Sequence, residues 1–160
     1  ITDAGWDASY INNIPTTPCT GLTTITTNTG TFDDGSIATA NYTDNSNCSL
    51  LIQPSAAGVL INLNFARFNT EAGNDMVTVY DGTTTADPVL ATLSGTNPPL
   101  PNILSTGGDL LITFVTNSSI TNLGWEANFT TQSVPPCSAT PTVFNAASGT
   151  FNDRSSATAN

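Results

Sequence analysis

Hydrophobic and polar residues alternate in several short stretches of this chain, which is the period of a β-strand with one buried face. The clearest stretch is residues 59–65, where every second side chain would face a core: Val59, Ile61, Leu63 and Phe65. Residues 76–80 and 110–115 also have the composition of strands, and turn residues such as Asp81-Gly82 separate them. Because no window keeps an apolar period of 3.6 residues, the chain is predicted to be all-β.

Three blocks of sequence occur twice, in the same order. Residues 30–41 recur as residues 149–160, residues 1–10 resemble residues 120–129, and Pro18-Cys19 is echoed by Pro136-Cys137. Chance similarity in a low-complexity sequence is the alternative explanation, but three ordered blocks favour a tandem array whose repeats are whole domains.

This array predicts five segments. Residues 1–11 would be the last strand of a preceding unit, residues 19–131 a complete unit, and residues 137–160 the start of a following unit. Residues 12–18 and 132–136 would be linkers, which their prolines make semi-rigid. Ile1 is not an initiator Met, so we expect the parent protein to be longer.

Charge narrows the possible partners. The chain has 12 acidic residues and two cations, Arg67 and Arg154, for a formal net charge of −10. Nucleic acid and anionic membrane surfaces are therefore unexpected partners, and no apolar run is long enough for membrane insertion. With no His in the chain, Ser-His-Asp and Cys-His nucleophile systems cannot be built from its own residues. Ca²⁺, glycans, protein surfaces and other copies of the chain remain.

The three cysteines fit the repeat pattern. Cys19 and Cys48 can close a loop inside the complete unit, whereas Cys137 opens the next unit without its partner. A disulfide would indicate secretion. Buried free thiols are the alternative, and a metal site is disfavoured because the Cys residues are dispersed and the chain lacks His.

The central unit also carries motifs spread along its length. They are an apolar strand ending in Glu (63–71), the pattern Asp-x-Val-x-Val-Tyr-Asp-Gly (75–82), Ile-Leu-Ser (103–105), an apolar strand ending in Phe (110–114) and Gly-Trp-Glu-Ala-Asn-Phe (124–129). Together with the two cysteines, they resemble the CUB domain. The resemblance implies an antiparallel β-sandwich of the jelly-roll type, located outside the cell or at its surface, with Cys19 and Cys48 at the positions of the family's first disulfide.

Two departures from the family pattern matter. Ser94 stands where a Cys of the second family disulfide would be expected. Calcium-binding members use a Glu and two Asp residues, and the corresponding positions here are Glu71, Asp75 and Asn117. An amide keeps an oxygen ligand but loses a charge, so the resemblance implies a Ca²⁺ site that binds weakly. The alternative is that Glu71 and Asp75 are ordinary solvated turn residues.

Other candidate sites have simpler structural explanations. Asp33-Asp34-Gly35 is expected to be a turn rather than a metal site, because its repeat copy is Asn152-Asp153-Arg154. Trp6 and Trp125 are candidates for stacking on sugars, but their equivalent repeat positions favour packing in a core. We also expect Tyr80 and Phe129 in the core. Catalysis is not expected, because few titratable side chains are present for acid-base chemistry.

The sequence therefore predicts a non-enzymatic extracellular repeat module. Tandem units would form a stalk, fibre or adhesin, with binding or self-assembly strengthened by multiplicity. Neighbouring units and other copies of the chain are the expected partners, followed by glycans or surface proteins. The alternative is an accessory glycan- or protein-binding array attached to a larger secreted enzyme.

Overall fold

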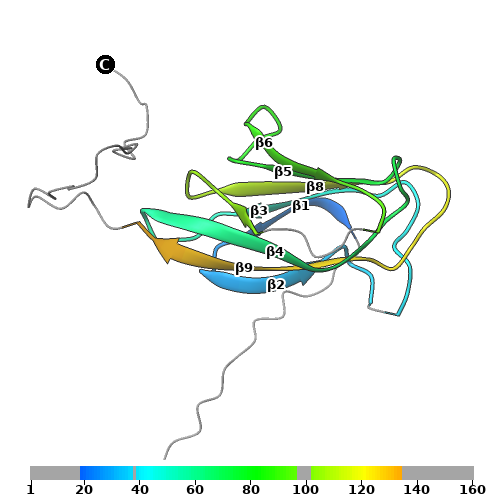
Figure 1. The fold of residues 1–160 in the computed structure, drawn as a ribbon, viewed down its shortest axis with the longest axis horizontal. Coiled ribbons are helices and arrows are strands. Elements are labelled where there is room, and N and C mark those ends of the chain that lie inside the picture. Colours follow the sequence, from blue (N-terminus) through cyan, green and yellow to red (C-terminus); the bar gives the residue numbers. More distant parts are fainter. Residues whose placement is uncertain (1–18, 38, 97–101, 135–160) are drawn as a thin grey trace, which may run out of the picture.

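A computed structural model describes residues 19–37, 39–96 and 102–134, which form two stacked β-sheets (Figure 1). The five-stranded sheet has the order β1-β3-β8-β5-β6, and the four-stranded sheet has the order β2-β9-β4-β7. The strands are β1 (Thr20–Ile25), β2 (Thr29–Asp33), β3 (Asn47–Ile52), β4 (Val59–Asn69), β5 (Met76–Tyr80), β6 (Val89–Leu93), β7 (Ile103–Leu104), β8 (Leu110–Val115) and β9 (Gly124–Ser133). The predicted all-β sandwich is confirmed.

The segments predicted on either side of the central unit lie outside the described residues. They are residues 1–11, the linker 12–18 and the start of a further unit at residues 137–160. The second linker, predicted for residues 132–136, is described only up to Val134. β9 continues to Ser133, and the backbone N–H of Val134 donates to the carbonyl of Gly58. The sheet therefore reaches into the sequence predicted as linker.

Strand pairing is antiparallel with one exception, because β1 runs parallel to β3. β1 is an edge strand, and its register places Gly21 beside Cys48. A disulfide joins Cys19, just before β1, to Cys48 in β3, with a Cα–Cα distance of 5.1 Å. The predicted cysteine pair is therefore bonded in the structure, and it attaches the edge strand to the core of its sheet.

β4 shows how strand periodicity builds the core. Val59, Ile61, Leu63 and Phe65 are buried as predicted. A β-bulge between Phe65 and Arg67 then shifts the register against β9, so that Phe68 is buried as well and Arg67 lies on the outer side. Simple alternation along the sequence would have placed Phe68 outside.

The centre of the sandwich is aromatic. Trp125 has no exposed surface and makes edge-on contacts with three phenylalanine rings from both sheets: Phe32, Phe65 and Phe114. This burial confirms the packing role predicted for Trp125, whereas Trp6 lies outside the described residues. Phe129 is buried as expected, but the prediction for Tyr80 is wrong. Val77 and Val79 take the inward positions of β5, so alternation leaves Tyr80 half-buried on the other face.

Candidate functional site

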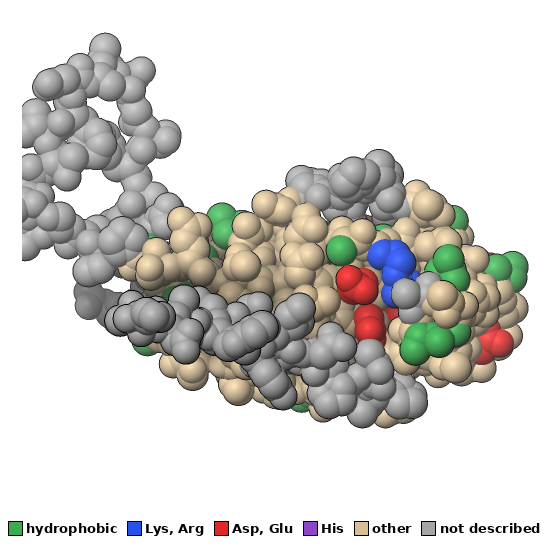
Figure 2. All heavy atoms as spheres, turned by 90° about the horizontal axis from the view of Figure 1, so that it is seen from below, with side chains coloured by type: hydrophobic (Ala, Val, Ile, Leu, Met, Phe, Trp, Pro, Cys, Tyr) green, Lys and Arg blue, Asp and Glu red, His purple; other side chains and the backbone are tan. Residues whose placement is uncertain are grey.

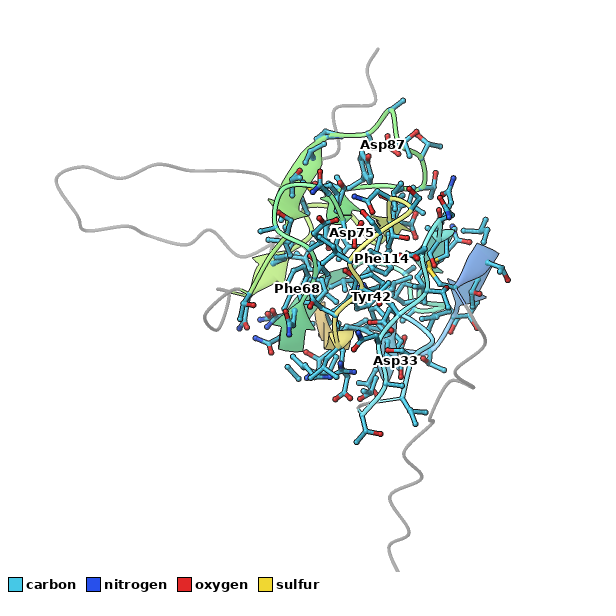
Figure 3. The ribbon with its side chains drawn as sticks, turned by 90° about the vertical axis from the view of Figure 1, so that its right-hand side faces the viewer. Asp33, Tyr42, Phe68, Asp75, Asp87 and Phe114 are labelled. Carbon is cyan, nitrogen blue, oxygen red and sulfur yellow. A yellow bond between two sulfur atoms is a disulfide. The ribbon has the colours of Figure 1, made fainter. Side chains whose placement is uncertain are left out.

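Three connections meet at one end of the sandwich, on the right in Figure 1 and facing the viewer in Figure 3. They join β2 to β3, β4 to β5, and β8 to β9. Glu71 and Asp75 lie in the second connection, and Asn117 lies in the third, just after β8. The structure brings these three predicted residues together. The side-chain Nδ2 of Asn117 donates to Glu71 Oε2 over 2.7 Å, and the backbone N–H of Asn117 donates to Asp75 Oδ1 over 2.8 Å.

Tyr42, from the β2–β3 connection, completes this arrangement. Its hydroxyl donates to Asp75 Oδ2 over 2.5 Å and accepts the backbone N–H of Glu71 over 2.9 Å. Its ring packs edge-on against Phe114, with the ring centres 5.2 Å apart. Sequence reasoning missed Tyr42, whose only signal was a lone aromatic residue in a polar segment. We call Tyr42, Glu71, Asp75 and Asn117 the carboxylate cluster.

Burial makes these hydrogen bonds necessary. Asp75 has no exposed surface, and a buried carboxylate without partners is strongly destabilising. Its two side-chain oxygens accept hydrogen bonds from Asn117 and Tyr42, and its backbone carbonyl accepts one from the Thr70 hydroxyl over 3.0 Å. Burial, followed by the hydrogen bond to Asp75, raises the pKa of Tyr42, so its phenol stays protonated and available as a donor.

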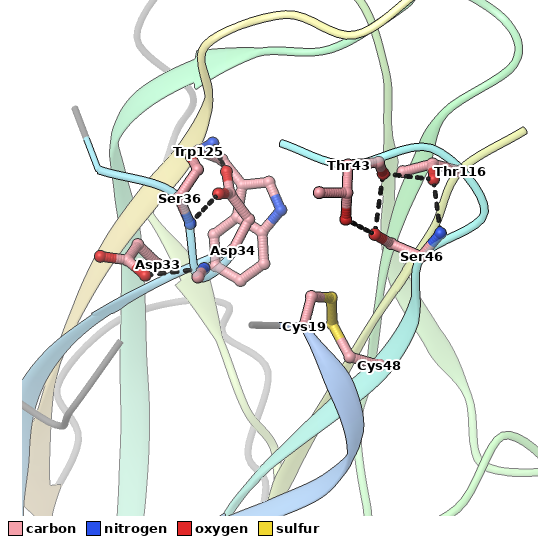
Figure 4. Close-up of a disulfide and its surroundings, with 10 residues drawn as sticks. Cys19, Asp33, Asp34, Ser36, Thr43, Ser46, Cys48, Thr116 and Trp125 are labelled. Atoms are coloured by element: carbon pink, nitrogen blue, oxygen red, sulfur yellow. Dashed lines mark hydrogen bonds between the residues drawn. A yellow bond between two sulfur atoms is a disulfide. The ribbon is translucent and has the colours of Figure 1, made fainter. Parts of the chain in front are cut away.

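A polar turn at residues 43–46, in the β2–β3 connection, is hydrogen-bonded to the residues that follow β8 (Figure 4). The Thr116 hydroxyl accepts the backbone N–H of Ser46 over 2.8 Å and donates to the carbonyl of Thr43 over 3.0 Å. The backbone N–H of Asn45 donates to the carbonyl of Asn117 over 2.6 Å. The backbone at Asn117 is therefore anchored to two loops, the polar turn through its carbonyl and Asp75 through its N–H.

Glu71, Asp75 and Asn117 differ in how well they suit a bound Ca²⁺. Glu71 and Asp75 offer the hard oxygen atoms that Ca²⁺ prefers. Asn117 does not fit as it is placed, because its Oδ1 accepts the backbone N–H of Ser119 over 2.7 Å and its Nδ2 therefore faces Glu71. Among the described residues, His, Cys, Asp and Glu side chains form no group of three that could hold a metal. A calcium site at Glu71, Asp75 and Asn117 stays a prediction.

The second acidic segment, Asp33-Asp34-Gly35, forms a turn. Asp33 Oδ1 accepts the backbone N–H of Gly35 over 2.8 Å, and Asp34 Oδ1 accepts that of Ser36 over 2.9 Å. The other carboxylate oxygen of Asp34 accepts the backbone N–H of Trp125 (Figure 4). Both side chains thus support the backbone, which is the role expected for a turn.

Arg67 is the one Lys or Arg in the described part of the chain, and it lies beside acidic side chains on one face (Figure 2). Arg67 opposes Glu126 in the β4–β9 register, and its guanidinium donates to the carbonyl of Leu123. The nearby Asp33 is partly buried, and this burial raises its pKa in spite of the Gly35 hydrogen bond and the charge of Arg67. Arg67 therefore binds the β8–β9 connection through the Leu123 carbonyl and places its positive charge near Asp33 and Glu126.

Comparison with known proteins identifies related sequences. A family model for the CUB domain matches residues 19–129. Human multiple epidermal growth factor-like domains protein 8 is 36% identical over 89 residues, which are 56% of this chain and 3% of that protein. Human cubilin is 31% identical over 133 residues, which are 81% of this chain and 4% of that protein. The chain therefore spans only a small part of these relatives.

Solved structures with the same fold were also found. The full extracellular region of zebrafish Gpr126/Adgrg6 has a TM-score of 0.63 and 24% identity, covering 74% of this chain and 15% of that one. The MASP-1 CUB2 domain bound to Ca²⁺ has a TM-score of 0.54 and 22% identity, covering 67% of this chain and 96% of that one. At this identity, the likeness concerns the fold.

Proposed function

This chain belongs to the CUB domain family, and from that membership we propose that it is a non-enzymatic interaction module in a tandem array that forms a stalk, fibre or adhesin. The domain is extracellular or displayed at the cell surface, as its relatives are, and it contains the disulfide typical of that environment. Within the described residues, no helix is long and apolar enough to span a membrane.

The observation that carries the array proposal is which residues the repeated blocks keep. Among the described residues of the block 30–41, which leave out position 38, the buried side chains are Phe32, Asp34 and Ser36. The copy at residues 149–160 keeps all three, as Phe151, Asp153 and Ser155. The positions that change are 33, 35 and 37, none of which is buried in the described unit.

The second block behaves in the same way. In residues 120–129 the buried positions are Gly124, Trp125, Ala127 and Phe129. The earlier copy has Gly5, Trp6, Ala8 and Tyr10 there, so three of the four buried residues are identical and the fourth stays aromatic. The other differences fall at positions 122, 123, 126 and 128, none of which is buried. Across the described residues of both blocks, every buried residue is kept or, at Phe129, replaced by another aromatic residue, and chance similarity gives no reason for this agreement with burial. These fragments therefore support further units with the same core.

The end of the sandwich where the β2–β3, β4–β5 and β8–β9 connections meet, here called the loop end, carries exposed apolar side chains that support an interaction role. Ile37, Ile120 and Leu123 are 63%, 64% and 40% exposed. Ile120 also has a φ of 59°, which is a strained conformation for a β-branched residue. Strain held at an exposed side chain is typical of a recognition site. Neighbouring units or other copies of the chain are the partners we propose, with glycans or surface proteins as the alternative.

A non-enzymatic role is supported by how the acidic side chains are used. The buried carboxylates of Asp34 and Asp75 accept backbone N–H groups and serve the fold. Calcium is the cofactor suggested by the structurally similar MASP-1 CUB2 domain, which was solved bound to Ca²⁺. The Asn117 amide presents a donor to Glu71, so the contact between these two side chains is made without an ion.

Electron microscopy and limited proteolysis of the parent protein test the array. We expect a string of similar globular units, with protease-resistant fragments that each run from a Pro-Cys pair to a Gly-Trp strand. A single large globule, or rapid cleavage within residues 19–131, would contradict the array proposal. A catalytic domain in the parent sequence, together with glycan binding by this chain, would favour the accessory-array alternative.

Adhesion is tested with beads coated with the parent protein. We expect the beads to clump with one another, and an Ile120→Asn variant, which accepts the positive φ but removes the apolar side chain, to clump less. Thr83→Asn, at an exposed position in the β5–β6 connection, is the matched control. Beads that stay dispersed alone, but bind glycan- or protein-coated beads, would exclude self-association and identify the partner class.

A further inference from the structure

Asn117 contacts both carboxylates of the cluster at once, through its side chain and its backbone N–H. We propose that Asn117 replaces a bound cation, so that the carboxylate cluster holds the three loops together without calcium. A cation at this place would bridge Glu71 and Asp75 electrostatically, and Asn117 bridges them with two hydrogen bonds. This inference is independent of what the loop end binds.

The hydrogen bonds form a closed ring through all four residues. Asn117 donates to Glu71 and to Asp75, Tyr42 donates to Asp75, and the backbone of Glu71 donates to Tyr42. The contacts between Asn117 and the two acidic residues cross 42 and 46 positions in the sequence. Three connections of the sandwich are therefore closed by one ring.

The orientation of the Asn117 amide follows from its second partner. The backbone N–H of Ser119, which can only donate, lies 2.7 Å from Asn117 Oδ1, and the Ser119 hydroxyl also donates to Oδ1 over 3.4 Å. Turning the amide to offer Oδ1 toward Glu71 would set Nδ2 against the Ser119 backbone N–H, and the hydrogen bonds of the amide with Glu71 and with that N–H would be lost. The backbone of Asn117 cannot move away easily, because the Asn117 carbonyl accepts the backbone N–H of Asn45. The side chain is thus held as a donor.

Charge distinguishes this cluster from one with three carboxylates. With Asp at position 117, the close approach to Glu71 would become a repulsive carboxylate pair, which a cation or a proton would have to neutralise. With Asn, three donors serve the two carboxylates: Asn117 Nδ2, the Asn117 backbone N–H and the Tyr42 hydroxyl. The amide therefore removes the electrostatic need for an ion.

The test compares thermal melting in about 1 mM EDTA and in about 2 mM CaCl₂, using the full chain and an Asn117→Asp variant. A ligand that binds only the folded state raises the melting temperature. We expect the wild-type melting temperature to agree within about 1 °C between the two conditions. For Asn117→Asp we expect a lower melting temperature in EDTA and a rise of about 4 °C or more with calcium.

Asn128→Asp is the matched control, because it adds the same charge at an exposed position of β9. It should show no calcium response. A wild-type rise of several degrees with calcium, or heat from calcium binding in calorimetry of the EDTA-treated wild type, would overturn the proposal. An Asn117→Asp variant that folds and ignores calcium would also overturn it. If that variant does not fold in EDTA, the wild-type comparison decides the question alone.

Discussion

Asp34 lies directly beneath Gly124, in the space that a side chain at position 124 would occupy. Its carboxylate accepts the backbone N–H of Trp125, and its own backbone N–H donates to the carbonyl of Trp125 over 3.3 Å. Gly124 has a φ of 70°, which favours glycine. The start of β9 is thereby attached to the turn after β2, next to the tryptophan at the centre of the core.

Replacing Gly124 with Ala should destabilise the domain by about 3 kcal/mol or more, because the new methyl group would collide with the Asp34 carboxylate and carry backbone strain. Gly58→Ala is the matched control, since Gly58 has a φ of 68° and open space around it. The control should lose only about 1 kcal/mol. Urea unfolding measures both losses, and equal losses would show that the collision does not matter.

Tyr42→Phe should lower stability by about 1 to 3 kcal/mol, because it leaves Asp75 Oδ2 and the backbone N–H of Glu71 without the hydroxyl. The edge-on contact with Phe114 would remain. Tyr80→Phe, on β5 outside the carboxylate cluster, serves as the control and should change stability by less than about 0.5 kcal/mol. Chemical denaturation provides the measurement. A loss in the control as large as in Tyr42→Phe would contradict a specific role for the hydroxyl.

Breaking the bond between Cys19 and Cys48 should cost about 3 to 4 kcal/mol in the chain-entropy account, since the bonded residues are 29 positions apart. The experiment starts from a Cys137→Ser background, which keeps only the two bonded cysteines. Thermal melts with and without a reducing agent should differ in this background. After Cys19→Ala and Cys48→Ala they should coincide at the lower temperature, and a reductant effect that persists would point to a different cause.

Asp33→Asn should raise stability slightly at neutral pH. Burial raises the folded-state pKa of Asp33 above its ordinary value of 3.8, so ionisation costs the folded state more than the unfolded state. Below pH 3.8 both states are protonated and the cost is absent. It grows as the pH rises from there through the raised pKa. Asn keeps an oxygen for the Gly35 N–H, and the repeat copy has Asn152 at this position.

Because Asp33 is partly solvated, the gain should be only a few tenths of a kcal/mol near pH 7. Urea unfolding of both proteins at about pH 7 and about pH 3 checks the sign, and the difference should vanish at the acid end. A variant that is less stable than the wild type at neutral pH would indicate that the charge helps the turn.

Local pattern was sufficient for much of the fold. Alternation predicted the inward set from Val59 to Phe65, and the repeat pattern indicated that Cys19 and Cys48 could pair. The meeting of Glu71, Asp75 and Asn117 was implied only by the resemblance to the CUB domain. The bulge after Phe65 and the outward Tyr80 were not predictable in this way. Both depend on the register in which a strand pairs with its neighbours, and the residues of the strand alone do not determine that register.

The alternation of hydrophobic and polar residues determines that this chain forms β-strands with one buried face, because successive side chains on a strand point to opposite sides. The resemblance to the CUB domain adds the sandwich. The sequence also determines which polar side chains the loop end carries. Closure of the sandwich decides which way those side chains point. Tyr42 reaches Asp75, and the Ser119 N–H turns the Asn117 amide into a donor, only once three distant loops have been brought side by side.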